Sequence, residues 1–177
     1  MNIGFVHATQ VCQHLESEPP ALERCLKALA DSQKGQLALQ KGASRKALNH
    51  LLRAEADFDA IPAATFLLGI VRADIAAAYA NLEQWPNAAR YSREAIEIAR
   101  DDKAFAQTEA NAHMTLANAL GSLGDLEAAR TEYDKAESIY KTLKGVEPQL
   151  HALQHNRRLL LEPTRSVAKP WWKFWEK

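Results

Sequence analysis

The stretch AAAYANLEQWPNAARYSREA, residues 76–95, shares its pattern of small residues with ANALGSLGDLEAARTEYDKA at 117–136 and with GQLALQKGASRKALNHLLRA at 35–54. Each stretch begins 41 residues after the one before it, so that Ala47, Ala88 and Ala129 align. The same register aligns four further sets: Gly35, Ala76 and Ala117; Ala54, Ala95 and Ala136; Leu51, Ser92 and Tyr133; and Ala38, Tyr79 and Leu120. A fixed period of this length indicates an internal structural repeat.

Each unit predicts a helical hairpin whose turn falls at Gly42, Glu83 or Gly124. Small residues at two fixed depths allow two antiparallel helices to approach closely, and a bulkier residue fills the space that remains. The sequence around the last turn also fits, because a glycine in the left-handed conformation ends one helix and Asp125 caps the next. Three hairpins that stack on their neighbours are therefore expected.

Helix periodicity and breaker residues give the expected element bounds. An N-terminal helix near 5–16 is followed by a break at Pro19-Pro20, and Gly145 and Pro148 mark the start of the last helix. The predicted paired helices are 21–41 with 43–59, 62–82 with 86–100, and 103–122 with 125–143, and a capping helix follows at 148–161. This divides the chain into an N-terminal segment (1–20), a repeat array with its cap (21–161) and a flexible tail (162–177).

Composition supports an all-α fold and excludes several functions. The chain has 177 residues, of which 32 are alanine and 22 leucine, and its formal net charge is zero. Because nucleic-acid binders need a basic excess, no nucleic-acid partner is expected. Two cysteines cannot form a disulfide framework, and the N-terminus lacks the basic and apolar regions of a signal peptide. We therefore expect a cytoplasmic protein.

The aligned columns resemble the tetratricopeptide repeat family, in the extended version found in kinesin light chains and in several bacterial regulators. The signature of small and large residues is carried by Ala76, Tyr79, Ala88 and Ala95, and by the corresponding residues of the last unit. The resemblance covers about residues 28–143 and is weaker in the first unit, where Asp31 and Lys34 replace apolar residues. It implies a right-handed α-solenoid of about three hairpins that binds proteins or peptides.

In such an array the first helix of each hairpin lines the concave surface. At about 100° per residue, one arc of each first helix presents mostly amide and apolar side chains. The candidate partner-binding residues are Gln33, Gln36, Gln40, Asp74, Asn81, Asn111, Met114, Asn118 and Ser122, accompanied by Ile70 and Ala77. Amides both donate and accept hydrogen bonds, which suits them to a peptide backbone. The alternative is that these amides only solvate the inner wall.

The C-terminal tail is the second candidate site. Trp171, Trp172, Phe174 and Trp175 are interleaved with lysines that include Lys173, and the segment 163–177 carries a net charge of about +3. Such a segment suits a weak membrane-surface anchor or a docking peptide for a partner protein. It could also fold back onto its own array or onto a second copy, or have no role.

No catalytic or cofactor motif is present in the sequence. Glycine loops for phosphates, nucleophile elbows and zinc-protease motifs are absent, and His151 and His155 stand four residues apart without a third ligand. We therefore expect no enzyme activity, metal or cofactor. The expected function is that of a non-enzymatic adaptor or scaffold with a docking tail. The alternatives are a peripheral membrane protein targeted by the tail and a self-assembling homo-oligomer.

Overall fold

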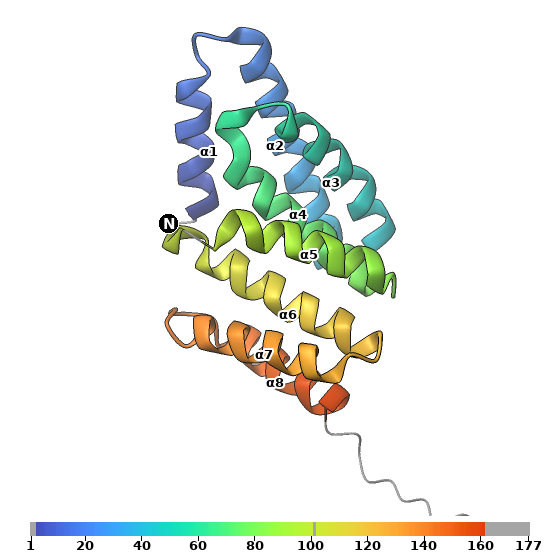
Figure 1. The fold of residues 1–177 in the computed structure, drawn as a ribbon. Helices are drawn as coiled ribbons and strands as arrows, with labels where there is room; N and C mark the ends of the chain where they lie inside the picture. The colour runs from blue at the N-terminus through green and yellow to red at the C-terminus, as the bar shows by residue number, and fades with distance from the viewer. Residues whose placement is uncertain (1–2, 101, 162–177) are drawn as a thin grey trace, which may run out of the picture.

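The computed structural model describes residues 3–100 and 102–161, and this part of the chain is all-helical (Figure 1). Its eight α-helices and two 3-10 turns follow the predicted pairs closely, with ends that differ by about one turn at most. The bounds are α1 Ile3–His14, α2 Pro19–Gln40, α3 Ser44–Asp59, η1 Pro62–Ala64, α4 Thr65–Asn81, α5 Trp85–Ala99, η2 Lys103–Phe105, α6 Ala106–Ser122, α7 Leu126–Tyr140 and α8 Glu147–Leu161. The prediction of an all-helical fold is confirmed.

Two of the predicted helix ends differ from the observed ones by less than one turn. Pro19 and Pro20 do not break the chain between helices, because they form the first turn of α2, where proline has no backbone hydrogen bond to lose. The boundary placed at residue 20 therefore falls inside α2. Helix α7 ends at Tyr140 instead of residue 143, and the backbone N–H groups of Thr142 and Leu143 bond to carbonyls three residues earlier. These tighter bonds end the helix before Gly145, whose φ is 74°.

Helices that follow one another in sequence pack side by side, from α2 against α3 through to α7 against α8 (Figure 1). In addition, α2 contacts α4, α4 contacts α6, and α6 contacts α8. The N-terminal helix α1 packs against α2, η1 and α4. The first helices of the three hairpins are therefore neighbours as well, with α8 next in the row.

The three hairpin turns have the same backbone geometry. Gly42, Glu83 and Gly124 all have positive φ angles, of 71°, 58° and 92°. The N–H of the next residue bonds to a carbonyl five positions back in each turn, as in Asp125 to Leu120 at 3.0 Å. Asp125 then caps α7 by accepting a hydrogen bond from the Ala128 N–H. The 41-residue register thus specifies a repeated turn, and Glu83 adopts a conformation that favours glycine.

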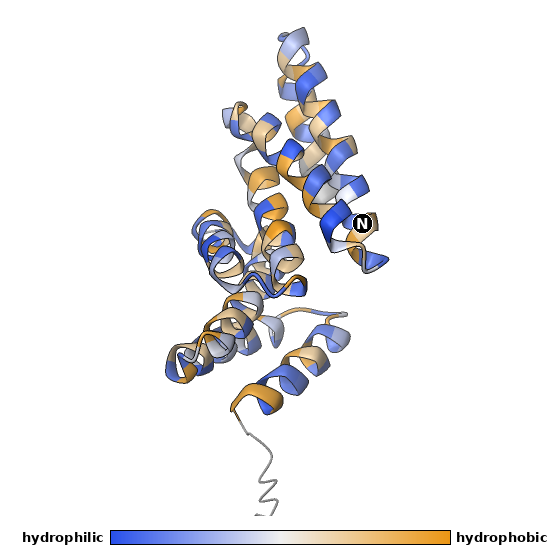
Figure 2. Ribbon diagram, turned by 90° about the vertical axis from the view of Figure 1, so that its right-hand side faces the viewer, coloured by the Kyte–Doolittle hydropathy of each residue, from blue (hydrophilic) through white to orange (hydrophobic). Residues whose placement is uncertain are grey.

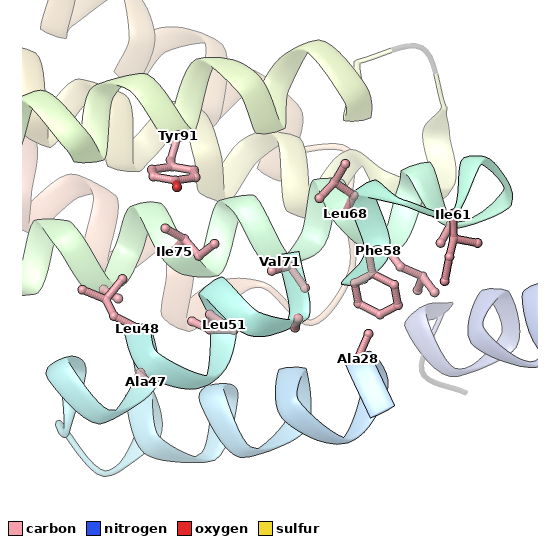
Figure 3. Packing of buried hydrophobic residues seen from close by; sticks show 14 of the residues in the cluster. Ala28, Ala47, Leu48, Leu51, Phe58, Ile61, Leu68, Val71, Ile75 and Tyr91 are labelled. Atoms are coloured by element: carbon pink, nitrogen blue, oxygen red, sulfur yellow. The ribbon is translucent and has the colours of Figure 1, made fainter. Parts of the chain in front are cut away.

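The aligned small residues lie in the interior between helices. Ala47, Ala88 and Ala129 are fully buried, and so are the alanines aligned at 54, 95 and 136. At Gly35 an added Cβ would lie 2.5 Å from the Cγ of Leu51, so α2 and α3 approach too closely there for a larger residue. Figure 3 shows Leu48, Leu51, Ile75 and Tyr91 from three successive helices packed in one core. Small residues at fixed depths therefore set the spacing of the helices.

One aligned set of residues is polar, in contrast to the small and apolar sets. It includes Asp31, which interrupts the apolar pattern of the first unit. Asp31 is buried, and its carboxylate lies 3.2 Å from His50 Nδ1 and 3.1 Å from Arg53 Nη2. Burial alone would raise the pKa of Asp31, but its contacts with His50 and Arg53 lower it overall. The residues aligned with Asp31 are Arg72, which pairs with Glu55 and Glu94, and His113, which pairs with Glu132. Each first helix thus places a polar side chain at this depth, and each of the three contacts an oppositely charged or hydrogen-bonding partner.

Helix α4 with its preceding turn, Pro62–Asn81, is the only segment of the described chain that is long and apolar enough to cross a membrane. Half of its most apolar window is buried against neighbouring helices, and α4 contacts α3, α5 and α6. Orange and blue residues alternate around most other helices when the ribbon is coloured by hydropathy (Figure 2). The central position of α4 accounts for its apolar composition.

Candidate functional site

The predicted partner-binding residues lie on α2, α4 and α6, the first helix of each hairpin, and we refer to them together as the first-helix face. Contacts between α2 and α4 and between α4 and α6 bring these helices side by side. Four of the residues are exposed, and these are Gln33, Gln40, Asn81 and Ser122. The remaining five are half-buried: Gln36, Asp74, Asn111, Met114 and Asn118. The exposed members can meet a ligand, whereas the half-buried members also take part in the packing of the fold.

Gln36 and Asp74 join α2 to α4 on this face. The Nε2 of Gln36 donates a hydrogen bond of 2.8 Å to Oδ2 of Asp74. Desolvation by burial raises the pKa of Asp74 to about 6, and the hydrogen bond from Gln36 only partly offsets this. Within residues 3–100 and 102–161 no ion pair includes Asp74. The carboxylate is held in place by an amide and has no cation paired with it in the part of the chain that the structure describes.

Asn111 and Asn118 have structural partners that the sequence analysis did not anticipate. The Tyr140 hydroxyl donates to Oδ1 of Asn111, and the Tyr133 hydroxyl donates to Oδ1 of Asn118. Both tyrosines are fully buried, and desolvation raises their pKa values well above the usual range. A buried hydroxyl without a partner destabilises a fold, so these two amides stabilise the last hairpin. Their side-chain amino groups remain as donors for the face.

The apolar members of the face belong to the core clusters. Ile70 packs against the first cluster, which extends over α2, α3 and α4, and Met114 packs against the cluster between α6, α7 and α8. Figure 3 shows this core, in which Ile75 of α4 lies between Tyr91 of α5 and Leu51 of α3. The face therefore combines exposed amides, half-buried apolar side chains and the single carboxylate of Asp74. Such a surface can hydrogen-bond a peptide backbone and accept a cationic side chain.

Two histidines on α8 and a buried cysteine on α2 lie outside the first-helix face. No group of three His, Cys, Asp or Glu side chains there lies close enough to hold a metal ion. His151 and His155 line an open hollow on α8 with Gln154. Burial and the adjacent Cys12 raise the pKa of the Cys25 thiol to about 12, so it stays protonated at neutral pH.

No family model matches the chain, and no curated protein matches it. The family resemblance therefore rests on the residues and their geometry alone. The tail residues Trp171, Trp172, Lys173, Phe174 and Trp175 lie outside the described residues.

Proposed function

We propose that the chain is a tetratricopeptide-like protein, a right-handed stack of three hairpins, that acts as a non-enzymatic adaptor. In this proposal the first-helix face binds a peptide or a partner protein. The repeat register supports the family assignment, because its aligned small residues are buried and its three turns share one backbone geometry. Fold alone does not define function, so the proposal depends on the face itself.

The observation that carries the proposal is the chemistry of the first-helix face around Asp74. Gln33 lies one turn before Gln36 on α2. Asn81 lies two turns after Asp74 on α4, and both Gln33 and Asn81 are exposed. The Asp74 carboxylate accepts one hydrogen bond, from Gln36, and has no cation partner among the described residues. Amides suit the backbone of an extended or helical peptide, and a half-buried carboxylate suits a lysine or arginine side chain. The favoured partner is therefore a peptide that carries at least one cationic residue.

Substitutions at two exposed amides, together with an isosteric change of the half-buried Asp74, test this proposal. The variant Gln33→Ala, Asp74→Asn, Asn81→Ala should bind the partner at least ten-fold more weakly. This is a loss of about 1.4 kcal/mol or more in binding free energy. The matched control is Asn49→Ala, Arg93→Ala, Ser138→Ala, which changes exposed residues on α3, α5 and α7. Equal affinity of the face variant and the control would remove the first-helix face from the account.

The composition of the tail favours a second candidate, a peripheral membrane protein. Tryptophans and lysines in a short segment match the residues that bind at the lipid headgroup level. Co-sedimentation with vesicles containing anionic lipid separates the two candidates. Binding that disappears when Trp171, Trp172 and Trp175 are changed to serine would favour the membrane candidate, whereas unchanged recovery in the supernatant would exclude it.

A further inference from the structure

The turn between α6 and α7 carries an unusual apolar and acidic surface, formed by Leu123, Asp125, Leu126 and Glu127. We call this the acidic turn surface. Leu123 is 52% exposed and Leu126 is 44% exposed, three residues apart on either side of the turn. Asp125 and Glu127 are also exposed, and neither takes part in an ion pair within the described residues. The surface therefore presents apolar area together with two carboxylates that have no cation.

Comparison with the turn of the middle hairpin indicates that this surface lacks a cover. The residues aligned with Leu123 and Leu126 are Leu82 and Trp85, and both are half-buried against core clusters. The first hairpin has Lys41 and Ser44 at these positions, so its turn has no apolar side chain to cover. The last hairpin therefore keeps the apolar character of the middle turn without the packing that covers it there.

The described chain ends next to this surface. An added Cβ at Gly121 would lie 3.1 Å from Cδ1 of Leu160, so the last turn of α8 packs on α6 two residues before Leu123. Figures 1 and 2 both place the end of α8 near the α6–α7 turn. Residue 162 therefore follows on from a position beside the acidic turn surface.

The remaining segment of the chain has the complementary chemistry. It contains Trp171, Trp172, Phe174 and Trp175, with lysines at 169, 173 and 177. The linker from Leu161 to Trp171 can span at most about 35 Å when fully extended. A short tether of this kind gives an effective concentration in the millimolar range, so that a contact with a Kd of about the same size is occupied about half of the time.

We propose that segment 169–177 docks in cis on the acidic turn surface. Its aromatic side chains cover Leu123 and Leu126, and its lysines face Asp125 and Glu127. Docking withdraws the tail from other partners, and release exposes the tail and the turn together. This contact does not depend on peptide binding by the first-helix face, because it uses a different set of residues.

Hydrogen exchange of the full-length chain tests the docking, with no lipid or partner present. The tail variant Trp171→Ser, Trp172→Ser, Trp175→Ser should exchange about two-fold faster at residues 120–128, since half occupancy protects an amide about two-fold. The aligned turns at 38–46 and 79–87 are internal controls and should not change. Equal exchange at 120–128 in both proteins would overturn the proposal.

Quenching of tryptophan fluorescence by acrylamide tests the same contact from the other side. Leu123→Ser with Leu126→Ser, and separately Glu127→Lys, should increase quenching of the full-length protein, because the tail tryptophans become accessible. The matched control is Leu26→Ser with Leu37→Ser, which removes two leucines that are 53% and 50% exposed on α2. Quenching that changes equally in the control, or protection that is lost on ten-fold dilution, would contradict docking in cis, and the latter would indicate a second copy.

Discussion

The first and last hairpins are equivalent units of the repeat, yet an aligned amide on the first-helix face has different partners in the two. Gln36 and Asn118 are aligned, and so are Leu51 and Tyr133 on the second helices of the two hairpins. Leu51 has no hydroxyl, and Gln36 extends to Asp74 on α4. Tyr133 is fully buried, and its hydroxyl donates to Asn118. One amide thus contributes to the face, while the other is engaged by the core.

A second pair of positions repeats this relationship. Leu29 and Phe58 of the first hairpin align with Asn111 and Tyr140 of the last, so an apolar pair is replaced by a hydrogen-bonded pair. The middle hairpin has Ala77 and Ser92 at the positions of Asn118 and Tyr133, and the buried Ser92 hydroxyl has no hydrogen-bond partner among the described residues. The role of an amide on the first-helix face can therefore be assigned only together with the aligned residue of the second helix.

The largest effect is expected when Asn111 is replaced and its hydrogen-bond partner Tyr140 is kept. Asn111→Leu leaves the buried Tyr140 hydroxyl without a partner and should lower the free energy of unfolding by about 2–3 kcal/mol. Adding Tyr140→Phe recreates the Leu29 and Phe58 pair of the first hairpin and should recover most of this loss. Urea unfolding of the single and double variants measures both values, and a double variant no more stable than Asn111→Leu would show that the two pairs are not equivalent.

A somewhat smaller effect is expected at the close approach of the first hairpin. Gly35→Ala places a methyl group against Leu51 and should destabilise the fold by about 1–2 kcal/mol, even though alanine favours helix. The last hairpin already has alanine at this position, Ala117, behind which Tyr133 packs. Thermal unfolding compares Gly35→Ala with Gly35→Ala plus Leu51→Ala, which removes the clash. A Gly35→Ala variant as stable as the wild type would contradict the spacing described for α2 and α3.

We expect Asp74 on the first-helix face to make the stability of the fold depend on pH. The folded pKa of Asp74 is raised from 3.8 to about 6, so its ionised form destabilises the fold. This penalty is absent below pH 3.8, develops as pH rises, and is complete above about pH 6. Asp74→Asn resembles the protonated form, and it should match the wild type near pH 3.5 and unfold at a higher temperature at pH 7.5. A difference in melting temperature that does not change with pH would contradict this origin.

The smallest effect is expected at the middle turn. Glu83 has a φ of 58°, whereas the other two turns have glycine at this position. Glu83→Gly relieves the left-handed strain but also makes the unfolded chain more flexible, so the net gain should be at most about 1 kcal/mol. The converse change Gly124→Ala should destabilise by a similar amount. Chemical denaturation measures the free energy of unfolding of both variants. Opposite changes of similar size are expected if the two turns share this left-handed geometry, and not if their geometries differ.

Helix pairs, turns and buried columns were predictable because the 41-residue register repeats small residues and breakers at fixed depths. The roles of Pro19 and Pro20 were not, because a first-turn proline and a helix break look the same in sequence. The pairing of Asn111 and Asn118 with tyrosines was missed because the surface arc of α6 was considered without α7. The aligned sets contained the signal, since tyrosine replaces Phe58 and Leu51 only where asparagine faces it.

Affinity capture from the native cell is the most direct test of the adaptor function. It would compare the wild type, the face variant Gln33→Ala, Asp74→Asn, Asn81→Ala, and the tail variant with Trp171, Trp172 and Trp175 changed to serine. The account predicts that the partners are lost with the face variant and recovered with the tail variant. Partners that remain bound to the face variant but are lost with the tail variant would contradict it and make the tail the functional element.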